Sequence, residues 1–297
     1  MKRWGIDLGG TKIECVVLDD ANHHEILIRK RVPTEADQGY PHIISQIKKL
    51  VDLVAEELNE YPSTVGFATP GVLEPDTQVM KNCNTVCMNG QPMKADIEAA
   101  LGIPVKLAND ANCFAFAEAM MGAGKEYPDA EVVFGVIMGT GVGGGIVINK
   151  KIVAGRHGIG GEWGHNILEE NGTPCYCGKS GCVEKVISGP GLENYYEKIS
   201  GQKLSLKEIV DRVDTDIHAA ATMERLAENY GKAISVITNI LDPDLIIIGG
   251  GVGNIDMIYT EGYERLKKYI FNKGKVTTPI IKPLLGDSAG VFGAALL

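Results

Sequence analysis

One stretch of the chain, between Gly160 and Glu184, concentrates residue types that bind metals. It contains one histidine and three cysteines in the spacing C-x-C-x-x-x-x-C, namely His165, Cys175, Cys177 and Cys182. One imidazole and three thiolates form the closed tetrahedral set that structural zinc takes, which leaves no open position for a catalytic water. Free cysteines are also common as small apolar core residues, but the glycines here supply the tight turns that a small metal loop needs. The segment therefore predicts a structural zinc site.

Two carboxylates accompany this set without being needed to complete it. Glu162 lies three residues before His165, and Glu184 lies two residues after Cys182. A rigid metal loop fixes the orientation of the groups at its edge. We therefore expect these carboxylates to be positioned for something other than the metal.

Two glycine turns, each set between strand-like runs, are candidates for binding phosphate. The first is Gly9–Lys12, with the sequence G-G-T-K, and the second is Gly139–Gly145, with the sequence G-T-G-V-G-G-G. Adjacent glycines let backbone N–H groups approach an anion closely. Paired glycines also turn many ordinary hairpins, so either turn alone is ambiguous. Their repetition indicates an internal duplication with phosphates held between two domains.

One aspartate is a candidate for proton transfer. Asp110 follows the strand expected at Val105–Ala108 and precedes the helix expected at Cys113–Met121. Asn and Asp are favoured at helix N-caps, which is the plainer interpretation of the sequence N-D-A-N from Asn109 to Asn112. A carboxylate at the end of such a strand could also act as a general base, because α/β proteins bind ligands at that edge of the sheet.

The elements that must position these groups alternate between strands and helices. Apolar residues at helical spacing predict helices at Tyr40–Leu58 and Met257–Phe271, and the chain ends in a predicted helix at Gly290–Leu297. Gly249, Gly250 and Gly251 follow a buried strand, where they could let a flat ring or a ribose lie against the backbone or could form a simple turn.

The composition argues against nucleic acid and membranes as binding partners. The chain has 297 residues, of which 44% are hydrophobic, with a formal net charge of -9 and no lysine or arginine cluster, which argues against nucleic acid. It has no signal-peptide pattern and no run near the ~20 apolar residues of a membrane span. Seven cysteines, three of them in a metal-like cluster, fit a reducing compartment. We expect a cytoplasmic protein of two α/β domains without a membrane partner.

Five motifs occur in one order: D-x-G-G-T-K from Asp7, N-D-A-N from Asn109, G-T-G-V-G-G-G from Gly139, G-E-W-G-H from Gly161 and C-Y-C-G-K-S-G-C-V-E from Cys175. Together they resemble the ROK family of sugar kinases and repressors, over essentially the whole chain. The resemblance implies the actin-like, ribonuclease-H-like ATPase fold, with a cleft between two α/β domains. The expected small domain is 1–118 with the C-terminal helix 286–297, and the expected large domain is 119–285 with the zinc loop.

The resemblance also implies roles for individual residues. Asp110 would be the general base, and Asp7 would hold Mg²⁺. The residues expected to bind ATP are Gly9, Gly10, Thr11, Lys12, Gly139, Thr140, Gly141 and Gly143 around the phosphates, and Gly249, Gly250 and Gly251 beside the adenosine. The residues expected to bind the sugar, besides Asp110, are Gly71, Asn84, Asn109, Glu162, His165 and Glu184.

Short phrases favour one sugar. Glucose-specific relatives carry N-L-P-x-W where this chain has Asn84-Thr-Val-Cys-Met, without the proline and tryptophan. The phrases K-N-C-N, N-G-Q-P, T-P-C-Y-C-G-K and L-A-N-D-A-N-C look most like the bacterial mannofructokinase branch, which predicts fructose with mannose as a second substrate. L-G-x-P-V and N-D-A-N-C-F are shared with the N-acetylglucosamine kinase branch, so N-acetylglucosamine is the alternative, with N-acetylmannosamine and glucose further ones. The resemblance also favours a homodimer.

A binding function without turnover is the competing hypothesis. The repressors of this family carry a winged helix-turn-helix ahead of the first phosphate turn, and Asp7 lies too close to Met1 for such a domain. We therefore expect an enzyme. A sugar-sensing protein in which Asp110 is only a helix cap is the remaining alternative.

Overall fold

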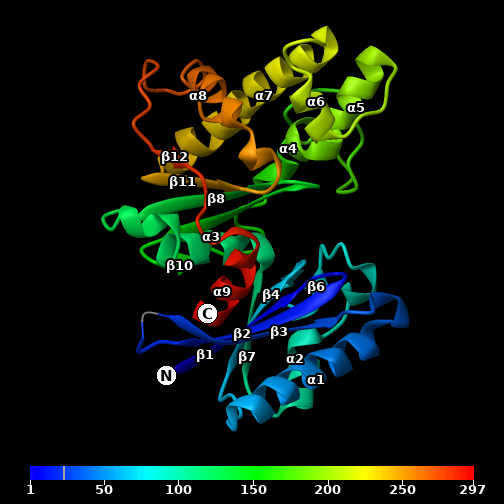
Figure 1. Cartoon of the computed structure of the whole chain (residues 1–297), viewed down its shortest axis with the longest axis vertical. Helices are drawn as coiled ribbons and strands as arrows, with labels where there is room; N and C mark the ends of the chain where they lie inside the picture. The colour runs from blue at the N-terminus through cyan, green and yellow to red at the C-terminus, as the bar shows by residue number, and fades with distance from the viewer. Residues whose placement is uncertain (23) are drawn as a thin grey trace. The chain divides into compact units, whose positions relative to one another are not determined.

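A computed structural model of the chain describes residues 1–22 and 24–297 (Figure 1). It divides into two compact units, one made of Met1–Met121, Ile152–Gly160 and Leu285–Leu297, and the other of Gly122–Lys151 and Gly161–Leu284. The expected division differs at residues 119–121 and 285 and in one whole segment, 152–160, all of which it assigned to the second domain. This segment packs with the first unit because Gly158 lies against Leu73, where an added Cβ would be 3.1 Å from the carbonyl oxygen.

The first unit is built on a five-stranded sheet with the order β3-β2-β1-β4-β7. Antiparallel pairing joins β1 (Lys2–Leu8) to β2 (Lys12–Asp19) and β2 to β3 (Glu25–Pro33), whereas β4 (Val65–Thr69) lies parallel to β1 and to β7 (Val105–Asn109). A separate ribbon pairs β5 (Val72–Leu73) with β6 (Met80–Lys81).

Helices cover both faces of this sheet, which explains the long apolar runs in its strands. Trp4, Ile6 and Leu8 alternate along β1 and pack in one core with α1 (Tyr40–Leu58) and α2 (Met93–Leu101). On the opposite face lie α3 (Asp110–Met120) and α9 (Ala289–Leu296). On this face α9 packs directly against Gly5, which has no side chain. An added Cβ at Gly5 would be 2.4 Å from the Val291 carbonyl oxygen.

The second unit repeats the first sheet's plan in the order β10-β9-β8-β11-β12. Its strands are β8 (Val132–Met138), β9 (Val142–Ile148), β10 (Lys151–Ile152), β11 (Leu245–Gly249) and β12 (Ile280–Ile281). Again the first two strands in sequence are antiparallel, and the last two, β11 and β12, join in parallel. This matching order supports the duplication that the two glycine turns indicated.

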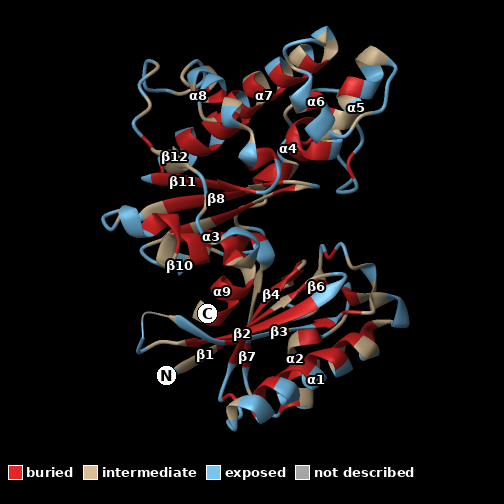
Figure 2. Ribbon diagram, viewed as in Figure 1, coloured by how far each residue is buried: buried red, intermediate tan, exposed pale blue. Residues whose placement is uncertain are grey.

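Five helices belong to the second unit: α4 (Val183–Ile187), α5 (Gly189–Ser200), α6 (Leu206–Asp211), α7 (Ile217–Leu241) and α8 (Glu261–Leu266). Figure 2 shows buried strands in both sheets, and helices such as α1 with one buried and one exposed side. Short 3₁₀ turns occur at Ala36–Gln38, Val86–Met88, Ala123–Glu126, Trp163–His165, Val252–Asn254, Asp256–Ile258 and Gly286–Ser288. In the described part of the chain, no helix has both the length and the apolar character that crossing a membrane requires.

The predicted helix at Tyr40–Leu58 is confirmed, whereas the one at Met257–Phe271 is wrong. A 3₁₀ turn at Asp256–Ile258 precedes a helix of only six residues, Glu261–Leu266. Thr260 between them has φ -108° and ψ -85°, which is not helical. Gly262 then packs on the ring of Tyr230, so tertiary contact overrides the helical spacing of the apolar residues.

Glu14 is a buried carboxylate in β2, with 2% of its surface exposed. Arg29 and Arg31 of β3 both pair with it, the Arg31 Nε at 3.0 Å from Oε2. Burial alone would raise the pKa of Glu14, but the hydrogen bonds and positive charges of the two arginines outweigh burial and lower it. The ionised carboxylate therefore stabilises the fold above its unfolded-state pKa, and this contribution is lost as the pH falls through the lower folded-state pKa.

The substitution Glu14→Gln should lower the free energy of unfolding at pH 7 by about 1 to 3 kcal/mol, because it removes charge-assisted hydrogen bonds. The difference between the variant and the wild type should shrink as the pH is lowered past the folded-state pKa, where the wild-type carboxyl is itself protonated. Urea unfolding at a series of pH values measures this. A difference that stays constant down to pH 3 would contradict it.

Candidate active site

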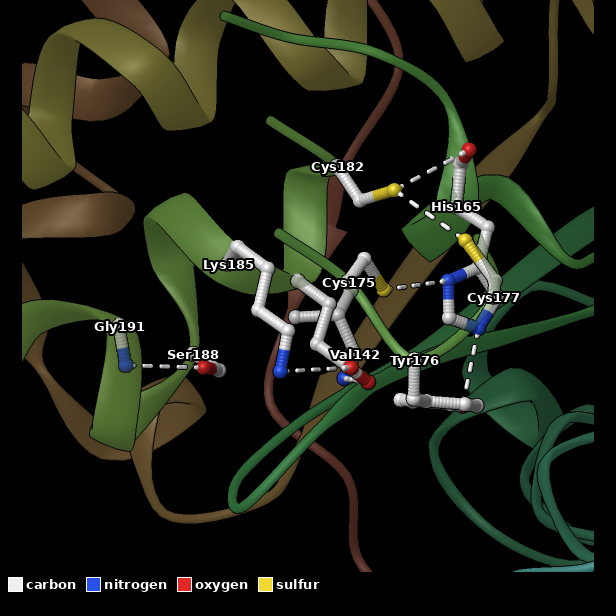
Figure 3. Close-up of polar contacts among 10 residues, drawn as sticks. Val142, His165, Cys175, Tyr176, Cys177, Cys182, Lys185, Ser188 and Gly191 are labelled. Carbon is white, nitrogen blue, oxygen red and sulfur yellow. Dashed lines mark hydrogen bonds and ion pairs between the residues drawn. The ribbon is translucent and has the colours of Figure 1, made fainter. Parts of the chain in front are cut away.

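The four predicted metal ligands converge in the second unit (Figure 3). The ligand atoms of His165, Cys175, Cys177 and Cys182 all lie within 4.8 Å of one another. The Cys175 Sγ is 3.6 Å from His165 Nδ1, and the Cys177 Sγ is 3.6 Å from the Cys182 Sγ. Ligands of a tetrahedral zinc, bonded at about 2.0 to 2.3 Å, stand roughly 3.6 to 3.8 Å apart. The residues present fit a zinc ion.

Local pairing shapes the loop that carries these ligands. Isolated antiparallel bridges join Ile167 to Cys182 and Pro174 to Ser180. The loop is also fastened to α7, because Arg225 pairs with Glu169 at 2.6 Å and its guanidinium lies 4.4 Å from the ring centroid of Tyr195. Sequence reasoning missed Arg225, since a lone arginine on a long helix carries no motif.

Glu184 joins the metal loop to the second glycine turn. It lies in the first turn of α4, is buried, and its Oε2 accepts a hydrogen bond from the Val142 N–H at 3.1 Å. Its Oε1 is 3.9 Å from the Lys185 Nζ. The Glu184 carboxylate thus accepts a hydrogen bond from the backbone of the second glycine turn and lies near the Lys185 ammonium group.

Glu162 is positioned by the segment around it. Gly161 before it has φ +97° and lies on β9, where an added Cβ would be 2.4 Å from the Gly144 carbonyl oxygen. Trp163 after it donates from Nε1 to the Gly143 carbonyl at 2.9 Å. Gly143 was predicted within the turn, but it lies inside β9 opposite Ile137.

The glycines predicted to bind nucleotide in the second unit lie side by side. Gly139 donates to the Gly141 carbonyl at 2.9 Å and Thr140 is exposed at the tip of the turn. Since β11 runs parallel to β8, Gly249–Gly251 emerges next to it, and an added Cβ on Gly139 would be 3.9 Å from the Gly251 nitrogen.

The first glycine turn is held by a residue that the sequence did not single out. The Gly9 N–H donates to the Lys12 carbonyl at 3.0 Å, leaving Gly10 and Thr11 exposed. The buried Thr34 donates from Oγ1 to the Gly9 carbonyl at 2.7 Å, and its N–H donates to the Thr11 carbonyl at 3.0 Å. Thr34 follows β3, and only the pairing of β3 with β2 brings it to the turn.

Two aspartates of the first unit influence each other electrostatically. Asp7 lies near the end of β1; burial, and then the negative charges of Asp110 and Glu14, raise its pKa to about 6, although Lys12 acts in the opposite direction. Carboxylate oxygens are the ligands that Mg²⁺ takes, and a cation here would offset this repulsion. Asp7 therefore fits a magnesium ligand.

The helix cap at α3 is Asn109, whose Oδ1 accepts from the Ala111 N–H at 2.9 Å. Asp110 is the first residue of the helix, and its side chain is exposed although its Oδ1 also accepts from Ala111 at 2.8 Å. Desolvation by the surrounding protein raises the pKa of Asp110, and the hydrogen bonds from Ala111 and Asn109 oppose this. The plain capping role thus falls on Asn109, and Asp110 is accessible to a substrate.

Asn84 is exposed on a loop that its neighbours fix in place. The Asn89 side chain accepts from the Cys83 N–H at 2.9 Å and donates to the Cys83 carbonyl at 3.0 Å. An added Cβ on Gly71 would be 2.5 Å from the Cys83 Sγ, so the absence of a side chain at Gly71 lets this loop approach. The sequence did not indicate this role of Asn89, because Asn89 reaches Cys83 only when the loop between them folds back.

Comparison with known proteins gives concordant results. The family model described as "ROK family" matches residues 3–297. The chain is 35% identical over 311 residues to an N-acetyl-D-glucosamine kinase of Vibrio parahaemolyticus, covering 99% of this chain and 98% of that protein. It is 36% identical over 305 residues to an N-acetyl-D-glucosamine kinase of Yersinia enterocolitica, with the same coverage. The likeness expected to mannofructokinases is not supported by these relatives.

Solved structures match over the same extent. The ROK hexokinase from Thermus thermophilus has a TM-score of 0.88 at 30% identity, covering 100% of this chain and 97% of that one. A ROK family glucokinase from Streptomyces griseus in complex with glucose and AMPPNP has a TM-score of 0.78 at 26% identity, covering 99% and 98%. These matches confirm the predicted actin-like, ribonuclease-H-like α/β fold. With a family model and relatives that both span nearly its full length, the chain belongs to the ROK family.

Proposed function

We propose that this protein is an ATP-dependent sugar kinase that transfers the γ-phosphate to a hydroxyl of N-acetylglucosamine. The observation that carries the proposal lies within the second unit, where Glu184, two residues after the metal ligand Cys182, contacts the backbone of the glycine turn at Val142. Sugar-binding and phosphate-binding groups are thus parts of one rigid assembly. The names of the relatives from Vibrio and Yersinia favour the same activity.

In this proposal the sugar is held by polar groups of known orientation. Glu162 and Glu184 accept hydrogen bonds from sugar hydroxyls, and Asn84 and Asn109 add contacts, with Gly71 shaping the loop that presents Asn84. His165 turns Nδ1 toward Cys175, so the sugar is proposed to bind at Nε2, which faces the Tyr176 hydroxyl at 3.0 Å. A zinc ion bound by His165 and the three cysteines would fix the tautomer and the direction of this ring.

Phosphoryl transfer depends on positioning and charge neutralisation more than on covalent chemistry. Asp110 accepts the proton of the attacking hydroxyl, a role that suits an exposed carboxylate with a raised pKa. The turns Gly9–Thr11 and Gly139–Gly141, with Lys12 and Thr140, bind the phosphates through the backbone N–H groups that do not close the turns, and Gly249–Gly251 borders the adenosine. Mg²⁺ on Asp7, through water, would offset the phosphate charge.

We propose N-acetylglucosamine rather than fructose because the likeness over the whole chain outweighs the likeness of short loop phrases. The phrases that suggested fructose lie largely in exposed loop positions, including Asn82, Asn84, Asn89 and Tyr176. Such loops vary among relatives without changing the scaffold. Likeness over the full length is the stronger guide, and the relatives matched over that length are named for N-acetyl-D-glucosamine.

Side-by-side assays of N-acetylglucosamine, N-acetylmannosamine, glucose, mannose and fructose with ATP test the substrate. We expect kcat/KM to be highest for N-acetylglucosamine and roughly tenfold or more lower for fructose, because unpaired polar groups in the site penalise the wrong sugar. Fructose ranking first would restore the original expectation. ADP formation with none of these sugars would instead favour a sugar-sensing protein.

The general base is tested by Asp110→Asn, which keeps the size of the side chain and removes its basicity. We expect kcat to fall roughly a hundredfold to ten-thousandfold, with the Kd for sugar changed by less than about threefold. Asp76→Asn, at an exposed aspartate of the same unit, is the matched control and should leave both constants unchanged. Normal turnover by Asp110→Asn would mean that this carboxylate is not the base.

Metal content is tested with Cys177→Ser. The wild-type protein should carry one zinc per chain by elemental analysis; the variant should lose it, and its sugar affinity should fall on the order of tenfold or more because His165 is no longer held. Cys87→Ser, a cysteine outside the cluster, should retain both zinc and affinity. Full sugar affinity in zinc-free protein would show that the ring needs no metal.

A further inference from the structure

Tyr176 lies between two of the cysteine ligands and places its phenol on the far side of the His165 ring (Figure 3). Its hydroxyl is 3.0 Å from His165 Nε2, and the two rings meet edge to face with centroids 5.2 Å apart at 89°. The imidazole is therefore contacted at both nitrogens, by the Cys175 thiol at Nδ1 and by the Tyr176 phenol at Nε2.

This contact occupies the nitrogen that the proposed function assigns to the sugar. A metal on Nδ1 leaves the proton of the neutral ring on Nε2, so Nε2 donates one hydrogen bond. One N–H serves one well-aligned acceptor, which is here the phenol oxygen. A sugar hydroxyl can take this hydrogen bond only when the phenol gives it up.

The position of Tyr176 allows such an exchange. The residue is 74% exposed, so its ring can turn into solvent without opening the core. The Lys185 ammonium group also lies near the Tyr176 ring, with Nζ 5.8 Å from the ring centroid. The same Nζ is 3.9 Å from Glu184 Oε1. The ring is thereby linked to both of the side chains, His165 and Glu184, that the proposed function places on the sugar.

We infer that Tyr176 is a positioning residue that substitutes for a sugar hydroxyl on His165 Nε2 and is displaced when the sugar binds. The inference rests on the proposed function, since it concerns the same sugar contact. In the sugar-free protein the phenol satisfies the Nε2 proton and fixes the ring. The cost of displacing it lowers sugar affinity without affecting the transfer step.

The test is Tyr176→Phe, which keeps the ring and removes the competing hydroxyl. We expect the Kd for N-acetylglucosamine, measured without nucleotide by calorimetry, to fall about threefold to tenfold, as befits the loss of one competing hydrogen bond. We expect kcat and zinc content to be unchanged. In ¹⁵N-histidine NMR spectra of the sugar-free proteins, the His165 Nε2 resonance should differ between Tyr176→Phe and the wild type, and N-acetylglucosamine should bring the two together.

Tyr269→Phe is the matched control, because it removes a partly exposed phenol that bonds Glu228, away from the histidine. It should change neither the Kd nor the His165 resonance. An unchanged or higher Kd in Tyr176→Phe, with normal sugar binding by the wild type, would overturn the inference and leave the proposed function standing. Failure of the wild type to bind or phosphorylate any of the hexoses would overturn the proposed function, and the inference with it.

Discussion

Parallel strand pairing is the constraint that brings Asp7, Asp110 and the glycines after β8 and β11 to their positions. In a parallel sheet the carboxyl ends of neighbouring strands meet at one edge, and ligands bind there. In the first unit this brings the end of β1, with Asp7, to the same edge as the end of β7, with Asp110. In the second unit the parallel pair β8 and β11 brings the turn at Gly139 to Gly250. Residues far apart in sequence become neighbours for this one reason.

The second unit adds a polar link that strand pairing alone would not provide. The Glu184 carboxylate accepts from the Val142 N–H while its own helix starts at the metal loop. A buried carboxylate needs such partners, since leaving it unpaired would cost several kcal/mol. The hydrogen bond from the Val142 N–H to the Glu184 carboxylate therefore holds the loop that carries His165 next to the turn that is proposed to bind phosphate.

Patterns local in sequence were the ones that could be predicted. The helix Tyr40–Leu58, the strand expected at Val105–Ala108 and the grouping of the four metal-binding side chains all follow from spacing or motif, and all are present. The run Gly143–Gly145 was assigned to a turn, but it lies in β9, where the approach of Trp163 requires a residue without a side chain at Gly144.

Residues that act through tertiary contact could not be found in this way. Thr34, Asn89 and Arg225 each hold a site segment by hydrogen bonds or ion pairs to a part of the chain that folding brings near. The prediction of fructose is not supported by the relatives, which are named for N-acetyl-D-glucosamine. Short identical phrases in exposed loops reflect local resemblance, whereas the residues proposed to bind the sugar come from several segments of the chain.

The C-terminal helix imposes an order on synthesis and folding. Gly5 of β1 and Gly66 of β4 have no side chains because α9 lies directly on them, so this part of the face stays uncovered until α9 has been synthesised. The second unit lacks this dependence, since its segments Gly122–Lys151 and Gly161–Leu284 are synthesised before α9. Domains generally fold as units as they are made. The half of the molecule translated first is therefore the half that completes its core last.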